Sequence, residues 1–387
     1  MNPFSFHSTG KSMKRTANDS PEEDLRSRYQ GCLLAGAVGD ALGAPIEMMS
    51  LSKIRNQFGE RGLTDLAPAY GRIGSITDDT QMTLFTAEGL LRAVARYNDR
   101  GICNPQSVIK RSYLRWLMTQ GEEPPEDEIS LLNPESSWLF QMPELHAIRL
   151  PGTTCLRSLR EPSRKIDEAS LVAKNNSKGC GGVMRVAPVG LFFAGHGSIP
   201  KENPEVFVQQ DFSFAGDISL LTHGHPLSTQ SSGAMAALVH LLVCGKSFPE
   251  ALSIVKNLLT RNDNGMVVWN LLERARDLAA SDLPPMEAIK KLGEGWVAEE
   301  ALAIATYSCC RGSTLEEALL IAVNHDGDSD STGSIAGNLM GAWRGMEAIP
   351  RRWLEKLELM EVIRGVADDL LDYRDWEKED WKRYPPY

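Results

Sequence analysis

Most of the chain after Tyr29 carries apolar residues at the period of an amphipathic helix. Three segments show this best, and in each the apolar side chains share one helical face: Leu84, Ala87, Leu91 and Val94; Met235, Leu238, Val239 and Leu242; and Ile335, Leu339, Ala342 and Met346. No alternating pattern of strand length stands out. The pattern therefore predicts an all-α protein.

Glycine and alanine are frequent inside two of the predicted helical segments, 31–43 and 333–341. Small side chains allow helix backbones to approach closely. We therefore expect a tightly packed, compact helical bundle.

Two stretches lack the helical pattern. Residues 1–24 are polar and carry both signs of charge, so we predict a flexible extension over 1–28 and a single domain over 29–387. A disordered or vector-derived terminus and a partner-binding arm are the two interpretations of this extension. Residues 121–170 are rich in proline and charge, and we expect a long connection with short helices that borders a pocket.

Composition narrows the function classes. The chain is 42% hydrophobic, and its 41 Lys and Arg against 51 Asp and Glu give a net charge of -10, which argues against a general nucleic-acid or membrane binder. No apolar run reaches the roughly 18 residues of a membrane span, and no secretory signal is visible, so we expect a cytoplasmic protein. The seven scattered cysteines form no CxxC pair and should be reduced.

Two acidic clusters, 77–80 and 325–332, are the strongest candidates for chemistry. Each precedes a predicted helix, where one Asp or Thr commonly caps the free N–H groups. Capping needs only one side chain, whereas the second cluster has Asp326, Asp328 and Asp330 at alternate positions. Crowded carboxylates repel one another unless protons or a cation are present. If the fold joins the clusters, they form an all-oxygen pocket for one or two hard divalent cations.

Two other metal sites do not fit the sequence. In an EF-hand loop, the expected glycine would be Ser331 and the closing glutamate would be Gly337. A zinc site is disfavoured because His223 and His225 have no cysteine or second histidine pair beside them. His223 is kept as a candidate pocket residue.

A glycine-rich segment, 177–185 (SKGCGGVMR), is a candidate phosphate-binding loop. Its backbone N–H groups could approach phosphate oxygens, with Lys178 or Arg185 adding positive charge. It is neither a Walker A motif nor a GxGxxG fingerprint, and a tight turn is the alternative. Residues 39–47 add two more carboxylates, Asp40 and Glu47.

Together these segments make the chain resemble the ADP-ribosylglycohydrolase family, the group of dinitrogenase-reductase-activating glycohydrolases and ADP-ribosylhydrolases. The resemblance runs from about Tyr29 to about Gly345 and rests on 39–47, 77–80, 177–185, 221–223, 295–307 and 328–331. It implies an all-helical orthogonal bundle with a binuclear magnesium or manganese site in a cleft that holds ADP-ribose.

The resemblance also implies two sets of site residues. The metal ligands would be Thr77, Asp78, Asp79, Asp328, Asp330 and Ser331, and the family often has threonine at the last of these. The substrate would be held by Ser177, Lys178, Gly179, Cys180, Gly181, Gly182, Met184, Arg185 and His223. Many relatives have Asn or Tyr where Cys180 stands. Glu47 matches a glutamate near the metals.

Cleavage of an N-glycosidic bond needs an activated water and help for the leaving nitrogen. Two divalent cations, Mg²⁺ or Mn²⁺, can hold the ribose hydroxyls and lower the pKa of a water whose proton a carboxylate then takes. The catalytic candidates are therefore Glu47, Asp79 and Asp328.

We expect the protein to remove ADP-ribose from arginine side chains of a modified protein. Cleavage of serine-linked or O-acetyl-ADP-ribose is the alternative within this class. A second class is an immunity protein that neutralises an ADP-ribosyltransferase, such as a toxin, by docking through the N-terminal extension. A third is a helical structural protein whose aspartates are only caps.

Overall fold

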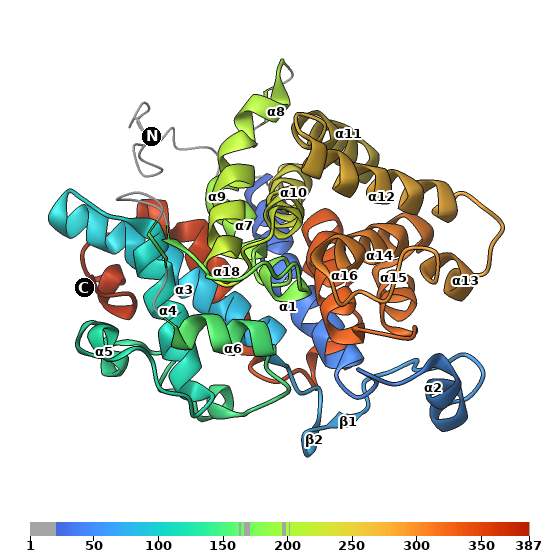
Figure 1. Ribbon diagram of the computed structural model, residues 1–387, viewed down its shortest axis with the longest axis horizontal. Coiled ribbons are helices and arrows are strands. Elements are labelled where there is room, and N and C mark those ends of the chain that lie inside the picture. Colours follow the sequence, from blue (N-terminus) through green and yellow to red (C-terminus); the bar gives the residue numbers. More distant parts are fainter. Residues whose placement is uncertain (1–20, 162–163, 166–170, 196–198, 201, 387) are drawn as a thin grey trace.

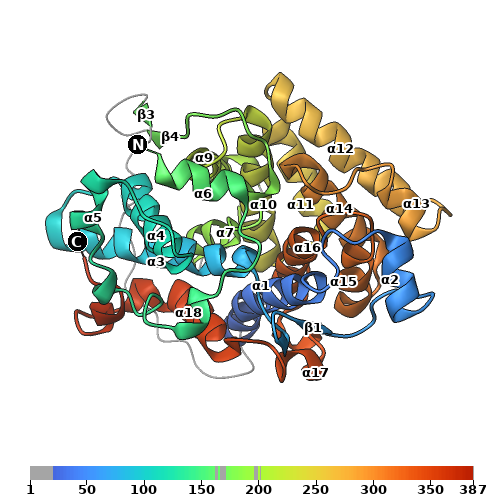
Figure 2. The same ribbon diagram turned by 60° about the horizontal axis from the view of Figure 1, so that its bottom comes forward.

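Helices make up nearly all of the regular structure (Figures 1 and 2). The structure is a computed structural model and describes residues 21–161, 164–165, 171–195, 199–200 and 202–386. Its α-helices are α1 (Pro21–Gly43), α2 (Leu51–Phe58), α3 (Asp78–Arg100), α4 (Pro105–Thr119), α5 (Glu126–Leu132), α6 (Thr153–Arg160), α7 (Ala187–Ala194), α8 (Pro204–Phe207), α9 (Gln209–Leu220), α10 (Pro226–Val243), α11 (Phe248–Leu259), α12 (Asp263–Ala279), α13 (Pro285–Ile289), α14 (Ala298–Arg311), α15 (Leu315–Val323), α16 (Ser329–Arg344), α17 (Arg351–Leu354) and α18 (Met360–Asp372).

Short 3₁₀ helices and two small hairpins complete the structure. The 3₁₀ helices are η1 (Pro134–Ser136), η2 (Pro143–His146), η3 (Cys180–Gly182), η4 (Met346–Ala348), η5 (Tyr373–Asp375) and η6 (Asp380–Arg383). Strands β1 (Pro68–Ala69) and β2 (Arg72–Ile73) form one antiparallel hairpin, and β3 (Arg164–Lys165) and β4 (Leu171–Val172) form the other. Within the described ranges these are the only strands. The predicted all-α fold is confirmed.

Helices α1 and α16 pack against each other along a seam of glycines near the centre of the bundle (Figure 1). A Cβ atom on Gly337 would collide with the carbonyl oxygen of Ala35, and one on Gly341 with that of Gly31. At the end of the seam, a Cβ atom on Gly43 would collide with the backbone of Asp330. The close approach therefore fixes the N-terminus of α16 against the C-terminal end of α1.

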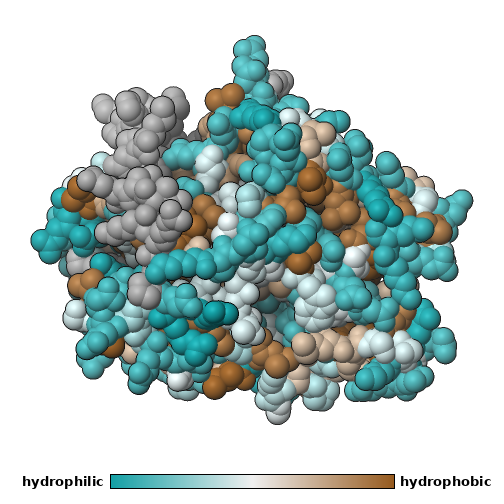
Figure 3. Space-filling view, in the orientation of Figure 1, coloured by the Kyte–Doolittle hydropathy of each residue, from teal (hydrophilic) through white to brown (hydrophobic). Residues whose placement is uncertain are grey.

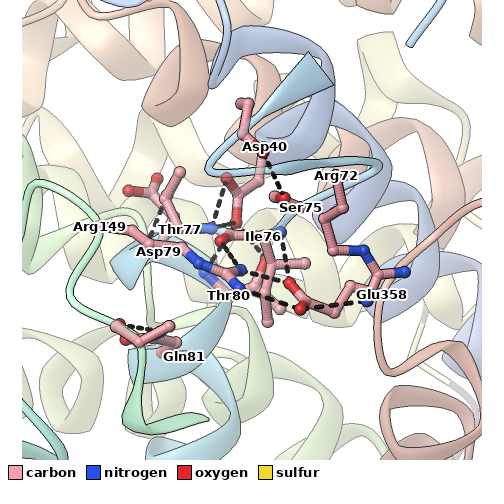
Figure 4. Close-up of polar contacts among 12 residues, drawn as sticks. Asp40, Arg72, Ser75, Ile76, Thr77, Asp79, Thr80, Gln81, Arg149 and Glu358 are labelled. Carbon is pink, nitrogen blue, oxygen red and sulfur yellow. Dashed lines mark hydrogen bonds and ion pairs between the residues drawn. The ribbon is translucent and has the colours of Figure 1, made fainter. Parts of the chain in front are cut away.

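Asp40, on the last turn of α1, fixes the N-terminus of α3 to the same helix (Figure 4). Its fully buried carboxylate accepts hydrogen bonds from the backbone N–H of Thr77 at 3.0 Å, and from the N–H of Thr80 at 3.1 Å and its hydroxyl. The first N–H groups of a helix have no partner within the helix, so a buried carboxylate satisfies them. Helix α1 thus brings the first turns of α3 and α16 together.

The middle of α3 is held by a buried cluster of charges. Glu88 accepts hydrogen bonds from Arg92 at 3.0 Å and from Arg115 of α4 at 2.8 Å, and none of the three side chains is exposed. Burial alone would raise the pKa of Glu88, but the charges of Arg115 and Arg92 outweigh it and lower that pKa to about 2. Arg92 also donates to the carbonyl of Pro385 at 3.2 Å, which ties the C-terminal segment to α3.

The first helix begins before the predicted domain boundary. Because α1 starts at Pro21, residues 21–28 of the predicted extension are helical, and Arg26 forms ion pairs with Asp368 and Asp372 at 2.9 and 2.7 Å. The remaining residues of the extension, 1–20, lie outside the described residues, and so does the predicted docking arm for a transferase. None of the helices that the structure describes is both long and apolar enough to cross a membrane.

The glycine seam predicts opposite effects for two Gly→Ala substitutions in helix interiors. Gly341→Ala should lower the free energy of unfolding by about 1–3 kcal/mol, because the new methyl group would collide with the backbone of α1. Gly365→Ala, in α18, should raise it by about 0.5–1 kcal/mol, because the nearest atom to the new methyl is Arg383 Nη1 at 3.8 Å. Chemical denaturation of both variants measures the difference, and equal effects would contradict the packing described here.

Candidate active site

The two acidic clusters open into one cavity of about 390 Å³. Its lining includes most of the predicted site residues: Glu47, Asp78, Asp79, Asp328, Asp330, Ser331, Gly179, Cys180, Gly181, Met184 and His223. A larger cavity of about 720 Å³, lined by residues of α2, α13 and α15, contains none of them. The smaller cavity is therefore the candidate active site.

Some residues of the acidic clusters cap helices and others line the cavity, whose lining does not include the predicted ligand Thr77. Thr77 is the N-cap of α3, and its hydroxyl accepts from the N–H of Asp79 at 3.4 Å. Asp328 is the N-cap of α16 and accepts from the N–H of Ser331 at 3.3 Å. The Ser331 hydroxyl donates to Asp79 Oδ2 at 3.4 Å and so links the two helix ends. Thr77 and Asp328 therefore act as helix caps. The carboxylates of Asp78, Asp79 and Asp330 line the cavity and are not the N-cap residues of either helix.

Two of these oxygens lack a partner. Asp79 Oδ1 and Glu47 Oε2 are buried and have no hydrogen-bond partner among the described residues. Among the described residues, no group of three or more His, Cys, Asp or Glu side chains is already arranged to hold a metal ion. The donors that surround the cavity are nevertheless mainly carboxylate and hydroxyl oxygens, which Mg²⁺ and Mn²⁺ prefer. The residues present therefore fit a hard divalent cation.

Crowding changes the protonation of the carboxylates. Burial, followed by the charge of Asp330, raises the pKa of Glu47 to about 9. Burial also raises the pKa of Asp78 to about 8, and burial together with Asp330 raises the pKa values of Asp79 and Asp328 well above their usual range. Like charges in a buried site disfavour ionisation. Without a cation, the cluster therefore favours the protonated form of these carboxyl groups.

The glycine-rich loop forms another wall of the cavity. The N–H of Cys180 donates to the carbonyl of Trp296 at 3.1 Å, and its thiol donates to Asp328 Oδ2 at 2.8 Å. A Cβ atom on Gly181 would lie 2.8 Å from the sulfur of Cys155 and 3.0 Å from the His223 ring. Glycine at this position therefore allows the loop to pack closely against Cys155 and His223, and phosphate binding by the loop stays a prediction.

Four residues of the predicted binding loop are absent from the cavity lining: Ser177, Lys178, Gly182 and Arg185. Lys178 forms an ion pair with Glu299 of α14. Gly182 and Arg185 are buried. Within the described structure these residues support the loop, and a direct contact with substrate stays a prediction for them.

Arg185 instead orients His223 through Thr222. Arg185 Nη2 donates to Thr222 Oγ1 at 2.6 Å, and the same oxygen lies 2.8 Å from His223 Nδ1. A guanidinium only donates, so the Thr222 proton can go to Nδ1, and in that tautomer Nε2–H of the imidazole lies on the side of Gly179 and Gly181. Burial and the charge of Arg185 lower the pKa of His223 to about 3. His223 is therefore a neutral hydrogen-bond donor beside the cavity.

Asp326 belongs to the acidic cluster in the sequence but not in space. Its Oδ1 accepts from the N–H of Leu51 at 2.6 Å, and Oδ2 lies 3.6 Å from Lys290 Nζ. The interpretation of three alternating aspartates as one set of ligands is therefore wrong for this member. Asp326 connects the cluster to α2, while Asp328 and Asp330 line the cavity.

Sequence reasoning missed several wall residues. Met48 and the segment 150–155 line the cavity, and the N–H of Gly152 donates to Asp78 Oδ2 at 3.0 Å. The expectation that the connection 121–170 borders the pocket is confirmed for this segment. The Pro151-Gly152 turn pair was the only local signal that the chain bends there.

The chain is similar to known proteins over most of its length. The sequence model of the ADP-ribosylglycohydrolase family matches residues 21–379. The chain is 27% identical over 353 residues to the ADP-ribosyl-dinitrogen reductase glycohydrolase of Rhodospirillum rubrum, and the alignment covers 90% of this chain and 96% of that protein. It is 23% identical over 351 residues to the ADP-ribosylarginine hydrolase Tri1 of Serratia proteamaculans, and the alignment covers 90% of this chain and 80% of that protein.

A solved structure supports the same assignment. The fold is similar to a chain of an ADP-ribosylglycohydrolase-related protein complex, with a TM-score of 0.54, 25% identity and coverage of 91% of this chain and 99% of that chain. Since the family match spans almost the whole chain, the protein belongs to the ADP-ribosylglycohydrolase family.

Proposed function

We propose that the protein is a metal-dependent hydrolase that removes ADP-ribose from arginine side chains of modified proteins. The observation that carries this proposal is the convergence of the α3 and α16 carboxylates on one cavity, with unpartnered oxygens on Asp79 and Glu47. The choice of arginine is supported by the relative named as an ADP-ribosylarginine hydrolase.

The metal ligands in this proposal are Thr77, Asp78, Asp79, Asp328, Asp330 and Ser331, and they would hold one or two divalent cations, Mg²⁺ or Mn²⁺. When bound, such cations would supply Lewis-acid stabilisation of the charge that develops on ribose and water oxygens. The hard donor set and the unpartnered Asp79 Oδ1 support this assignment.

The chain's own residues would manage protons and position the substrate. Hydrolysis joins a water oxygen to the anomeric carbon as the bond from that carbon to the arginine nitrogen breaks. One proton leaves the water, and one reaches the departing nitrogen. Glu47 can accept the water's proton at Oε2 once its carboxyl is ionised, and Asp79 and Asp328 are the other candidates for this step. The Nε2–H of neutral His223 can donate to a diphosphate or ribose oxygen beside the glycine loop.

The proposal predicts release of free ADP-ribose from an arginine-ADP-ribosylated protein in the presence of Mg²⁺ or Mn²⁺, and its loss in the presence of a chelator. Asp79→Asn should reduce the rate at least about 100-fold, since it removes a carboxylate from the site. Asp326→Asn is the matched control, because Asp326 lies in the same sequence cluster but faces α2, and it should retain activity. Chromatography of the released ADP-ribose measures the rate for the wild-type protein and for the two variants.

Each failure of this assay has a distinct meaning. A folded Asp79→Asn protein with full activity would show that the carboxylate cluster is not the catalytic site. Release of ADP-ribose from a serine linkage or from O-acetyl-ADP-ribose, but not from arginine, would contradict the proposed arginine specificity. The proposed hydrolase activity would still hold.

The raised pKa values also predict how stability changes with pH. A carboxyl group whose pKa is about 8 or 9 in the folded state and near 4 when unfolded binds protons on folding, so the metal-free protein should lose stability as pH rises from about 4 to about 8. A cation that binds only the folded protein at 100 times its Kd adds about 2.7 kcal/mol. The increase in Tm caused by Mg²⁺ should therefore be larger at pH 8 than at pH 5.5, where protons compete.

Differential scanning calorimetry with and without Mg²⁺ tests this pH dependence. The Asp79→Asn protein should show a smaller increase in Tm, while Asp326→Asn should behave as the unmodified protein does. An increase in Tm that is independent of pH would count against the carboxylate cluster as the cation site.

A further inference from the structure

Three exposed apolar residues beside the cavity adopt a backbone conformation that disfavours them. Met48, Tyr70 and Leu150 have φ values of 61°, 51° and 50°, and their exposed fractions are 69%, 40% and 56%. Residues other than glycine rarely adopt positive φ, with Asn and Asp the least penalised. Of the other three such residues among those described, two are asparagines, Asn133 and Asn203. We call Met48, Tyr70 and Leu150 the apolar rim.

The local sequence does not explain these side chains. Tyr70 and Gly71 form the turn of the β1–β2 hairpin, and both have positive φ, as in a type I′ turn whose usual first residue is Asn, Asp or Gly. Leu150 precedes Pro151, which narrows its backbone choices further. Met48 ends the turn after α1, where Gly or Asn is common. A smaller or polar residue would fit each backbone position better.

A buried hydrogen-bond network holds the segments around Tyr70 and Leu150 in place. Glu358 is 2% exposed and accepts from the N–H of Ile76 at 3.2 Å, from Arg72 at 3.2 Å and from both Nη atoms of Arg149 (Figure 4). Arg149 Nη1 also donates to the carbonyl of Ile76 at 2.6 Å, and its guanidinium lies 5.7 Å from the centre of the Tyr70 ring. This network connects the residue before Leu150 to the segment after the β1–β2 hairpin. Strain that persists in a locked structure is typical of functional sites.

The rim borders the cavity mouth. Met48 and Leu150 line the same cavity as Asp78, Asp330 and the other carboxylates. Tyr70 is not part of that lining, but its ring lies beside the guanidinium of Arg149, the residue before Leu150, and so continues the apolar surface from the cavity edge. Figure 3 shows apolar side chains gathered below α6 and beside the β1–β2 hairpin on this face of the molecule. Other exposed apolar residues, such as Ile102 and Val267, lie away from the cavity lining.

We propose that the apolar rim of Met48, Tyr70 and Leu150 docks the protein part of the substrate, through an apolar side chain next to the modified residue. This inference rests on the proposed function. The polar ADP-ribose would occupy the carboxylate- and glycine-lined interior, while the modified side chain is still attached to its protein and must cross the mouth. Exposed apolar groups on a constrained backbone lose less entropy when they bury an apolar neighbour. The rim therefore selects the sequence around the modified residue.

The test uses two synthetic ADP-ribosylarginine peptides that differ only beside the modified residue, one with phenylalanine and one with serine. The KM of the unmodified enzyme should be about fivefold lower for the phenylalanine peptide, as for a single buried apolar contact. In Met48→Asn, Tyr70→Asn and Leu150→Asn proteins this preference should fall toward onefold. Ile102→Asn, which removes an apolar side chain about as exposed as Met48 but away from the cavity lining, should keep it.

A second readout separates docking from a structural role. Asparagine tolerates positive φ, so Met48→Asn and Leu150→Asn should keep or raise Tm, by up to about 3 °C, while the peptide preference is lost. A preference that survives in all three variants, or is absent from the unmodified enzyme, would overturn the inference. If the enzyme hydrolyses neither peptide, the proposed function fails instead. The affinities of the two peptides are then compared as Kd values. Equal Kd values would contradict docking at the apolar rim.

Discussion

The close contact between α1 and α16 sets the position of everything around the cavity. Glycine carbonyls and Cα atoms touch along this seam, so α16 cannot slide or tilt without a backbone collision. Asp40, on the same helix α1, accepts hydrogen bonds from N–H groups at the start of α3 and so holds that end of α3 in place. Two helix N-termini from distant parts of the sequence thus meet because each is tied to the last turn of α1. The carboxylates on them need no contact with one another to be brought together.

This arrangement brings several carboxylates together in a buried site, where like charges disfavour ionisation. Thr77 and Asp328 offset part of the cost, because they cap α3 and α16, and the capping and ligand interpretations of these residues are compatible. Asp79 and Glu47 keep buried oxygens without partners, and the pKa values of the cluster rise accordingly. The apolar rim shows the same compromise in the backbone, with Met48 and Leu150 in conformations that favour glycine or asparagine. Local departures from the most stable choice therefore gather at one cavity.

Much of this could be predicted from the sequence, because the relevant signals are local. Helical periodicity identified α3, α10 and α16, and the density of carboxylates at 77–80 and 328–331 identified cavity residues that simple caps do not require. Asp326 could not be separated from its neighbours, since its partners Leu51 and Lys290 are supplied by other elements. The direction in which Arg185 points, and the return of the segment 150–155 to Asp78, likewise depend on tertiary packing. The start of α1 at Pro21 was missed because residues 22–28 are mostly polar and lack an apolar period.

The most direct test of the account is the anomalous diffraction of crystals grown with Mn²⁺, recorded at the manganese edge. The account predicts anomalous density within the cavity, with oxygens of Asp79 on α3 and of Asp328 or Asp330 on α16 as ligands to the ions. Ordered manganese elsewhere, with the α3 and α16 carboxylates bound only to protein groups, would contradict it.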